Sequence, residues 1–413
     1  MEDRKLYAKI LGVRAPWGVQ DVVLNHKDGD LTVKIVRQSG NCRCPVCGAQ
    51  ASGYDHRIRR WRHLDTCQYR TIIEARVPRV KCPEHGVHQI KVPWSEENSR
   101  FTELFEALIV SWLQDASIEA VARHFGLSWD AVDGIMQRAV ARGLARKETR
   151  ELKRIGVDET SYRKGHNYLT VVTDLEKGTV EYVAEDRTTD TLSAFYKSLP
   201  EQMRENIETV AMDMWPAFMK ATMRHVPGAE EKICYDKFHV AQHLGNSVDK
   251  VRRQEHKALR KEGRDELTGT KYWWLHNPAN IRDAKWYGQF NELRKANLKT
   301  ARAWAIRQEA MGLWHYRSRA WAYKAWRKWY GWAIRSRLEP VKKTARMIKK
   351  HLDGIVNAVV HQVSNAGAES MNSRIQGLKK RARGYRNTER LKTVIYFHFG
   401  GLDLSPATHT ISG

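Results

Sequence analysis

Thiol and imidazole side chains gather in one short stretch near the N-terminus of the sequence. Cys44 and Cys47 stand three positions apart, and Cys82 and His85 repeat that spacing further along the chain. Each pair can place two donors on one ion, and four S and N donors make the closed tetrahedral shell that Zn²⁺ takes in structural sites. The sequence therefore predicts a zinc ion that folds a module and takes no part in catalysis.

Reduced cysteines without a metal are the alternative for this stretch. Five of the six cysteines lie between residues 42 and 82, and the chain begins without the apolar centre of a signal peptide. Disulfides are therefore disfavoured. The exact ligand set stays open because the same region holds further possible donors: Cys42, His56, His63, Cys67 and His88.

Isolated carboxylates end β-like runs in the middle of the chain. Asp158 closes the first strand of an alternating strand and helix pattern, and Asp213 closes the fourth. In a sheet of order 3-2-1-4-5 these strands are neighbours, so the two carboxylates would lie side by side. Two charges 4 Å apart repel by about 4 kcal/mol at an effective dielectric of 20, and a divalent cation removes that cost. Asp174 and Asp236, after the second and fifth strands, compete for the same role.

A third acid, Glu369, opens a helical segment between residues 364 and 385. One apolar stripe should pack this helix: Ala368, Met371, Ile375, Leu378 and Ala382. Glu369 falls on a separate polar face, which we expect to turn toward the strand-end acids, although a solvated surface glutamate is the alternative. A basic run continues the segment and is expected to contact DNA: Lys379, Lys380, Arg381 and Arg383.

Residues 117–132 have the pattern of two short helices joined by a Phe-Gly-Leu turn. A capping serine opens each helix, Ser117 for the first and Ser128 for the second. Apolar residues fall where two crossed helices would bury them: Ile118, Val121, Phe125, Leu127, Val132 and Ile135. The pattern predicts a helix-turn-helix whose second helix enters the major groove, with a plain helical hairpin as the alternative. We expect Ser128, Trp129 and Arg138 to contact DNA.

Charge is spread unevenly along the 413 residues, whose formal net charge is +24. Residues 246–350 hold 27 Lys and Arg against 9 Asp and Glu, together with nine of the fifteen tryptophans. We interpret this segment as an all-helical unit with tryptophans inside and cations facing a polyanion; a solvated helical domain is the alternative. No run of 18 uncharged apolar residues occurs, which favours a cytosolic protein without a membrane partner.

Together these motifs resemble the DDE transposases of bacterial insertion sequences, and among them the ISL3 family. The similarity covers the two Cys/His pairs, the helix-turn-helix and four blocks at residues 156–159, 211–215, 235–239 and 365–372. It implies an RNase H-like core in which Asp158, Asp213 and Glu369 bind catalytic Mg²⁺ (or Mn²⁺). Asp236 and His239 match an Asp-x-x-His motif that related transposases carry after the fifth strand.

We therefore predict a multidomain α+β protein. An N-terminal β and zinc-binding domain (1–95) precedes a helix-turn-helix DNA-binding domain (96–150). An RNase H-like α/β catalytic core (151–245 and 356–413) follows, interrupted by the basic, Trp-rich, all-helical insertion (246–355).

The predicted activity is two-metal DNA cleavage and strand transfer by an insertion-sequence transposase. One ion would activate water to cut at the transposon end, and the freed 3′ hydroxyl would attack a target phosphodiester. The zinc module and helix-turn-helix would read the terminal inverted repeats, and the insertion would bind DNA phosphates. The family implies a homodimer or larger assembly on paired ends, in the bacterial cytoplasm and associated with the nucleoid. A repressor without catalysis and a nuclease without strand transfer are the alternatives.

Overall fold

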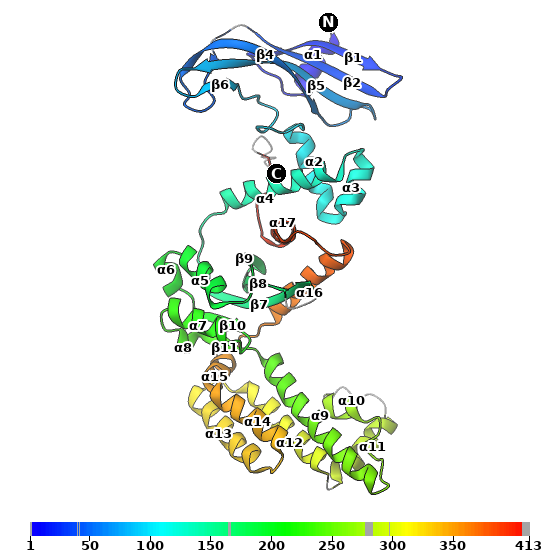
Figure 1. Cartoon of the computed structure of the whole chain (residues 1–413), viewed down its shortest axis with the longest axis vertical. Coiled ribbons are helices and arrows are strands. Elements are labelled where there is room, and N and C mark those ends of the chain that lie inside the picture. Colours follow the sequence, from blue (N-terminus) through cyan, green and yellow to red (C-terminus); the bar gives the residue numbers. More distant parts are fainter. Residues whose placement is uncertain are drawn as a thin grey trace. The chain divides into compact units, whose positions relative to one another are not determined.

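The computed structural model describes residues 2–38, 40, 42–163, 167–276, 284–296 and 298–406. The chain divides into two compact units (Figure 1). The first contains residues up to 148 together with 396–398 and the segment from 402 onward; the second contains residues 149–395 and 399–401. Each unit has its own secondary structure and its own buried core.

The first unit begins with helix α1 (Glu2–Ile10) and a β module. Its strands are β1 (Trp17–Asn25), β2 (Asp30–Arg37), β3 (Cys42–Arg43), β4 (Gln50–Arg62), β5 (Arg70–Cys82) and β6 (Gly86–Gln89). They pair in the order β1-β2-β5-β4-β3, and β6 pairs with β5. Alternate residues of β2 and β5 face a common core: Leu31, Val33, Ile35, Ile73, Ala75 and Val77. The period-two pattern of the sequence thus fixes which face is buried.

Three helices complete the regular part of the first unit: α2 (Glu103–Asp115), α3 (Ile118–Phe125) and α4 (Trp129–Arg146). The Ser117 and Ser128 hydroxyls accept the backbone N–H groups of Ala120 and Ala131, as the predicted caps should. Gly126 adopts a left-handed φ of 63° between α3 and α4. Of the expected core positions, Val121, Val132 and Ile135 are fully buried and the other three are half-buried: Ile118, Phe125 and Leu127.

A mixed sheet is the centre of the second unit. Its strands are β7 (Arg154–Arg163), β8 (Asn167–Asp174), β9 (Thr179–Glu185), β10 (Thr209–Met212) and β11 (Ile233–Tyr235), in the order β11-β10-β7-β8-β9. Strand β10 runs parallel to both β7 and β11, whereas β7, β8 and β9 are antiparallel. Numbered along the chain, this order is 3-2-1-4-5, so the expected pairing of the first and fourth strands is confirmed.

Short helices connect these strands: α5 (Thr189–Ser198), α6 (Glu201–Glu205), α7 (Pro216–His225) and α8 (Ala229–Lys232). Helices α5 and α6 are separate because Pro200 stands at the N-cap of α6 and cannot continue α5.

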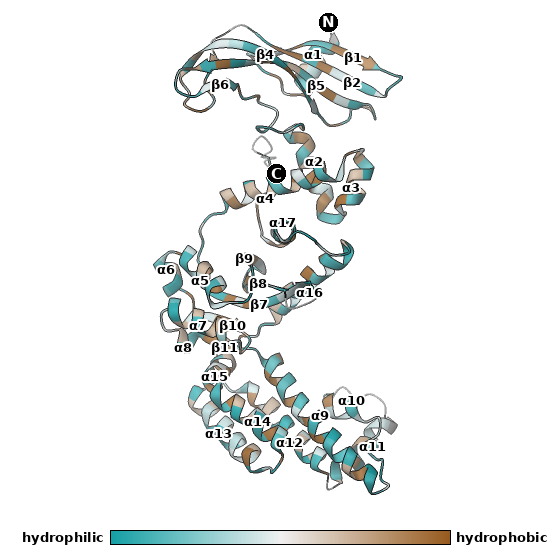
Figure 2. Ribbon diagram, in the orientation of Figure 1, coloured by the Kyte–Doolittle hydropathy of each residue, from teal (hydrophilic) through white to brown (hydrophobic). Residues whose placement is uncertain are grey.

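The basic segment is helical, as its composition indicates. It contains α9 (Lys237–Lys261), α10 (Lys271–Leu275), α11 (Ala284–Lys295), α12 (Lys299–Gly312), the 3₁₀ turn η2 (Leu313–His315), α13 (Arg319–Arg335), α14 (Glu339–Lys350) and α15 (Leu352–His361). Figure 2 shows hydrophilic and hydrophobic residues interleaved along α9 and α14. One core joins these helices to the sheet through Tyr235, Val240 and Ile355. Residue 246, the expected start of the insertion, lies inside helix α9, which is continuous from Lys237 to Lys261.

The tryptophans of this segment divide into two groups. Seven are buried or half-buried: Trp273, Trp274, Trp286, Trp304, Trp314, Trp326 and Trp329. Trp321 and Trp332 are 59% and 40% exposed, so the expectation that all nine pack inside is wrong for these two. Both lie on a face of α13 away from the buried Trp326. The alternation of aromatic and basic residues in the sequence does not distinguish these two faces.

Helices α16 (Ala366–Arg381) and α17 (Thr388–Phe399) close the regular structure. No helix in the described ranges is both long and apolar enough to cross a membrane.

Candidate active site and nucleic-acid interface

Two aspartates lie just past the paired residues of the central parallel strands. Asp213 follows β10 as predicted, but Asp158 lies within β7, which continues to Arg163 in its pairing with β8, so the prediction that Asp158 closes its strand is wrong. The β7–β10 register pairs Val157 with Met212, so Asp158 and Asp213 follow at the same level. Burial raises the pKa of Asp158 to about 6, and the Asp213 charge adds to the effect. Burial also raises the pKa of Asp213. The sheet therefore holds two acids where their charged forms are disfavoured.

A second acidic group lies at the neighbouring strand end. Asp236 follows β11, whose Tyr235 pairs with Met212, and one ligand atom each from Asp236, His239 and Glu369 lies within 4.8 Å of the others. Asp236 accepts backbone N–H groups from Phe238 (3.1 Å) and Asn365 (3.2 Å). Burial and the adjacent Asp236 raise the pKa of Glu369.

His239 lies near both groups. A positive charge on its ring favours the charged forms of Asp158, Asp213 and Glu369 and so offsets part of the rise that burial causes in their pKa values. Among the described residues, the only acidic group in which three donors meet so closely is that of Asp236, His239 and Glu369. Asp158 and Asp213 lie beside it, so the structure brings the five predicted catalytic residues to one end of the sheet.

Helix α16 is fixed along β7 by its polar face. Asn372 donates to the Glu159 carbonyl (3.1 Å), and Gln376 and Lys379 donate to the Ser161 carbonyl (2.9 and 2.8 Å). Four members of the predicted apolar stripe are buried: Ala368, Met371, Ile375 and Leu378. The fifth, Ala382, is exposed and corrects the prediction, because the helix ends at Arg381.

Gly156 permits the close approach of α16 to β7. A Cβ at this position would lie 2.9 Å from the Ala368 Cβ, 2.8 Å from Leu175 Cδ2 and 3.1 Å from Asn365 Oδ1. Each distance is shorter than an ordinary contact, so any larger residue would displace the first turn of α16. That turn carries Glu369, so Gly156 permits this acid to approach the sheet.

Arg187 is a neighbour of the acids that sequence reasoning missed. Its guanidinium pairs with Glu159 (2.6 Å) and lies over the rings of Tyr168 and Trp215, 4.1 and 4.3 Å from their centroids. Trp215 donates in turn to the Arg187 carbonyl (3.0 Å). No periodicity marks this arginine, which follows β9 in a turn. The structure places a fixed positive charge beside Asp213.

Asp174, a competitor in the sequence, has a different role. It pairs with Ile155 at the start of β7, three residues before Asp158. Arg150 binds its carboxylate (2.8 Å), which also accepts the N–H groups of Glu176 and Lys177. Asp174 therefore stabilises a turn and does not join the acidic cluster.

The four predicted zinc ligands lie together in the first unit. One donor atom each of Cys44, Cys47, Cys82 and His85 lies within 4.8 Å of the others. The Cys47 and Cys82 sulfurs are 3.8 Å apart, and Cys82 Sγ is 3.5 Å from His85 Nδ1. A tetrahedral Zn²⁺ with Zn–S bonds of about 2.3 Å requires sulfurs about 3.8 Å apart, so the set fits zinc. The backbone N–H of Cys47 lowers the pKa of Cys44 to about 7, which favours the thiolate.

The spare donors lie outside this group. His63 is buried and shares a 2.8 Å hydrogen bond with Thr102, and desolvation lowers its pKa to about 4. His88 Nε2 hydrogen bonds with the His85 carbonyl (2.6 Å). His63 is therefore a neutral core residue, and His88 supports the loop that carries a ligand.

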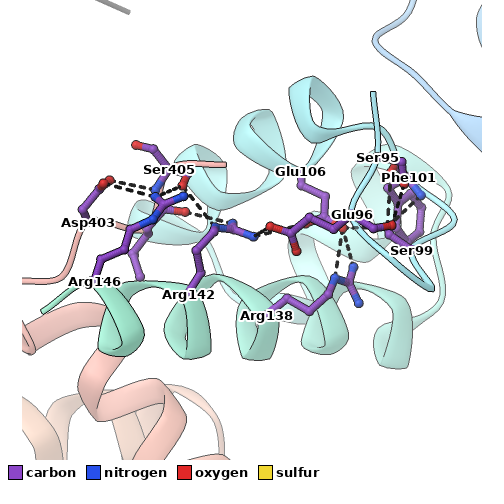
Figure 3. Close-up of polar contacts among 11 residues, drawn as sticks. Ser95, Glu96, Ser99, Phe101, Glu106, Arg138, Arg142, Arg146, Asp403 and Ser405 are labelled. Atoms are coloured by element: carbon purple, nitrogen blue, oxygen red, sulfur yellow. Dashed lines mark hydrogen bonds and ion pairs between the residues drawn. The ribbon is translucent and has the colours of Figure 1, made fainter. Parts of the chain in front are cut away.

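Helix α4, the second helix of the helix-turn-helix, carries three arginines on successive turns. Figure 3 shows Arg138, Arg142 and Arg146 reaching from α4 toward acids and carbonyls of the same unit. Arg138 Nη2 lies 2.5 Å from Glu106 Oε1, and the Glu106 side chain is only 1% exposed. The predicted DNA contact of Arg138 therefore competes with a buried ion pair.

The C-terminal segment completes this network. Arg142 pairs with Glu96 and donates to the carbonyls of Leu404 (3.0 Å) and Ser405 (3.1 Å), and Arg146 donates to Ser405 (2.6 Å) (Figure 3). Gly143 permits the approach, because a Cβ there would lie 2.8 Å from the Leu402 Cβ. Residues 402–405 thus belong to the helix-turn-helix fold.

The other predicted DNA contacts lie at the two helix ends. The Ser128 hydroxyl caps α4, and Trp129 is half-buried at its first turn. At the end of α16 the basic side chains of Lys380, Arg381 and Arg383 are exposed, whereas Lys379 bonds to Ser161.

Comparison with known proteins assigns these arrangements to one class. A zinc-finger family of the transposases of IS204, IS1001, IS1096 and IS1165 matches residues 40–85. The helix-turn-helix domain of the ISL3 transposases matches residues 90–140, and the ISL3 transposase domain itself matches residues 155–395. A zinc ribbon, a DNA-binding helix-turn-helix and a DDE domain in this order define a DNA transposase.

Whole-chain relatives agree with this class. The transposase for insertion sequence element IS1001 of Bordetella parapertussis is 29% identical, over 94% of this chain and 96% of the relative. The transposase for IS1557 of Mycobacterium tuberculosis is 27% identical, over 95% and 94%. The chain belongs to the ISL3 family of insertion-sequence transposases.

Proposed function

We propose that this transposase cuts the ends of its insertion sequence and joins them to target DNA with Asp158, Asp213 and Glu369 holding two Mg²⁺ (or Mn²⁺) ions. The observation that carries the proposal is the meeting of Asp236, His239 and Glu369 within 4.8 Å, with His239 also acting on the charges of Asp158 and Asp213. Burial raises the pKa values of all three acids, so their charged forms are destabilised in the folded protein. A divalent cation would stabilise these charged forms.

The strand order supports an RNase H-like core. Strands β7 to β11 would form its sheet, α16 would bring the last acid back to it, and helices α9 to α15 would be the all-helical insertion. In this arrangement the insertion separates Asp236 from Glu369 in sequence, while the core places them in contact.

The reaction has two balanced steps. In the first, water attacks the phosphorus at the transposon end, the P–O3′ bond breaks, and a free 3′ hydroxyl and a 5′ phosphate result. In the second, that hydroxyl attacks a target phosphodiester, forms a new P–O3′ bond and releases the 3′ hydroxyl of the target strand. When bound, the two metal ions would supply Lewis-acid stabilisation of the attacking and leaving oxygens.

The residues of the chain have separate tasks. Asp158, Asp213 and Glu369 would bind the ions, and Asp236 would position Glu369 through their direct contact. His239 would orient an acid or the scissile phosphate. Arg187, fixed by Glu159 and two rings, offers positive charge to a DNA phosphate beside Asp213. A covalent protein intermediate is not required.

DNA recognition would fall to the first unit and the basic surfaces. The zinc module and α4, with Ser128 and Trp129 at its start, would read the inverted repeats. Arg138 would reach DNA only by leaving Glu106. The exposed end of α16 would bind phosphates, and two copies or more would pair the two ends on the nucleoid.

Purified protein, an end-containing duplex and Mg²⁺ or Mn²⁺ test the proposal. A transposase cuts the duplex and joins it to a second DNA; a repressor only shifts the intact duplex, and a nuclease cuts without joining. Asp158→Asn, Asp213→Asn and Glu369→Gln should each abolish cutting and keep end binding. Glu201→Gln, an exposed glutamate in the first turn of α6, is the matched control and should cut normally. Normal cutting by the three variants would refute the site.

A further inference from the structure

A pocket of about 320 Å³ opens on the helical segment, between α12, η2 and α13. Its lining is mainly aromatic and basic. The polar and aromatic side chains that a ligand could contact include Glu309, Tyr316, Trp321, Lys324, Lys328 and Trp332. None of them belongs to the acidic cluster, the zinc site or the helix-turn-helix.

The two exposed tryptophans of the segment define this pocket. Trp321, Lys328 and Trp332 are seven and four positions apart, so they share one face of α13. The two tryptophans are about 16 Å apart along the helix axis, because each residue rises 1.5 Å. They are 59% and 40% exposed although tryptophan is a costly residue to leave in water. A face of this kind suits a partner with flat apolar surfaces.

The charge between the tryptophans selects the type of partner. Lys324 Nζ lies 4.8 Å from the centre of the Trp321 ring, and Lys324 and Lys328 are both exposed without an ion pair to any described residue. Glu309 contributes one carboxylate to the lining, which can accept an N–H group of a base. An apolar protein partner would have to bury both lysines uncompensated.

Aromatic contacts connect the pocket to the acidic cluster. Lys237, next to Asp236, lies with its Nζ 5.7 Å from the ring centre of Trp314. Trp314 packs edge-on against Trp326 at 6.1 Å, and Trp326 packs against Trp329 at 5.5 Å. Trp329 lines the pocket. The pocket is therefore part of the same packed body as the strand-end acids.

We propose that this pocket binds an unpaired segment of DNA, with bases stacked on Trp321 and Trp332 and phosphates held by Lys324 and Lys328. Single strands expose the base faces that aromatic side chains stack on, whereas a duplex hides them. This inference rests on the proposed function, since staggered cleavage of the two strands at an end leaves unpaired nucleotides.

Binding of a fluorescent single-stranded thymidine oligonucleotide to the full-length protein tests the proposal, measured by anisotropy without added divalent ions. Trp321→Ala and Trp332→Ala should each weaken binding about tenfold. Tyrosine at either position should retain most of the affinity, because its ring still stacks. Lys324→Gln and Lys328→Gln should each make the affinity less dependent on salt.

Tyr272→Ala is the matched control, since Tyr272 is 62% exposed and has Lys271 Nζ 5.4 Å from its ring but lies outside the pocket. It should bind the oligonucleotide like the wild type. Unchanged binding by the Trp321→Ala/Trp332→Ala double variant would overturn the proposal, as would an equal loss in binding of an end-containing duplex. Because the assay involves no cleavage, its outcome is independent of whether the Asp158, Asp213 and Glu369 variants still cut.

Discussion

Replacement of Asp158 by asparagine should stabilise the second unit while it abolishes cleavage. Asparagine has nearly the same shape, and its Oδ1 can still accept the 2.8 Å hydrogen bond from the Glu159 N–H. What the change removes is a carboxyl whose pKa rises from 3.8 to about 6 in the folded chain, mainly through burial. Such a rise corresponds to about 3 kcal/mol at neutral pH.

The sign follows from proton linkage. A carboxyl with a raised folded-state pKa favours folding while it is protonated, so the wild type loses stability as pH rises from about 4 through about 6. The advantage of Asp158→Asn should therefore be small near pH 4.5, about 1 kcal/mol, and reach about 3 kcal/mol at pH 8. Added Mg²⁺ should stabilise the wild type more than the variant, because a cation offsets the same charge.

Urea unfolding at pH 4.5 and pH 8 measures this difference. Since a chain with two units need not unfold in one step, hydrogen exchange of the β7 and β10 amides assigns the transition to the second unit. Glu201→Gln serves as the control and should show no such dependence on pH. One contrary result is an Asp158→Asn variant no more stable than the wild type at pH 8, and another is an advantage of the same size at both pH values. Either result would refute the claim that the buried charge of Asp158 destabilises the second unit.

Three further predictions follow from close contacts elsewhere. Gly156→Ala should push the first turn of α16 away from β7 and lower the rate of end cleavage about 100-fold, while a gel shift still shows end binding. Cys44→Ser should lower bound zinc below about half an equivalent by metal analysis of protein purified without chelator, because a closed tetrahedral site loses one of its four ligands. Glu106→Gln should destabilise the first unit by about 3 kcal/mol in thermal unfolding, since it leaves Arg138 without its buried partner; an unchanged melting curve would contradict this.

The parts of the fold that the sequence predicts are those set by local pattern. Alternation locates β7 and β10 and so places Asp158 and Asp213 near each other, although β7 continues past Asp158 to Arg163. The 3.6-residue stripe of α16 leaves Glu369 on a separate face, which meets Asp236 and His239. Two-residue spacing likewise identifies the zinc donors, because a tight turn alone brings both members of each pair together.

The parts that escaped prediction depend on tertiary packing. Nothing near Arg187 in the sequence shows that Tyr168 and Trp215 will enclose it. The Trp-rich helices have apolar and basic residues on every side, so their pattern does not tell exposed Trp321 from buried Trp326. The contact of Asp236 with Glu369 needs the helical segment to return the chain to the sheet, and strand counting alone left its role beside Asp213 open.

The segment 402–405 has a consequence for the synthesis of the protein. Arg142 Nη2 binds the Leu404 carbonyl across 262 positions of the chain. On the ribosome, α4 therefore emerges long before the residues that hold its last turns, and the whole catalytic segment must be translated in between. The first unit can therefore complete its fold only after the second unit has been translated. A stalled or prematurely terminated product would lack the segment that binds Arg142 and Arg146.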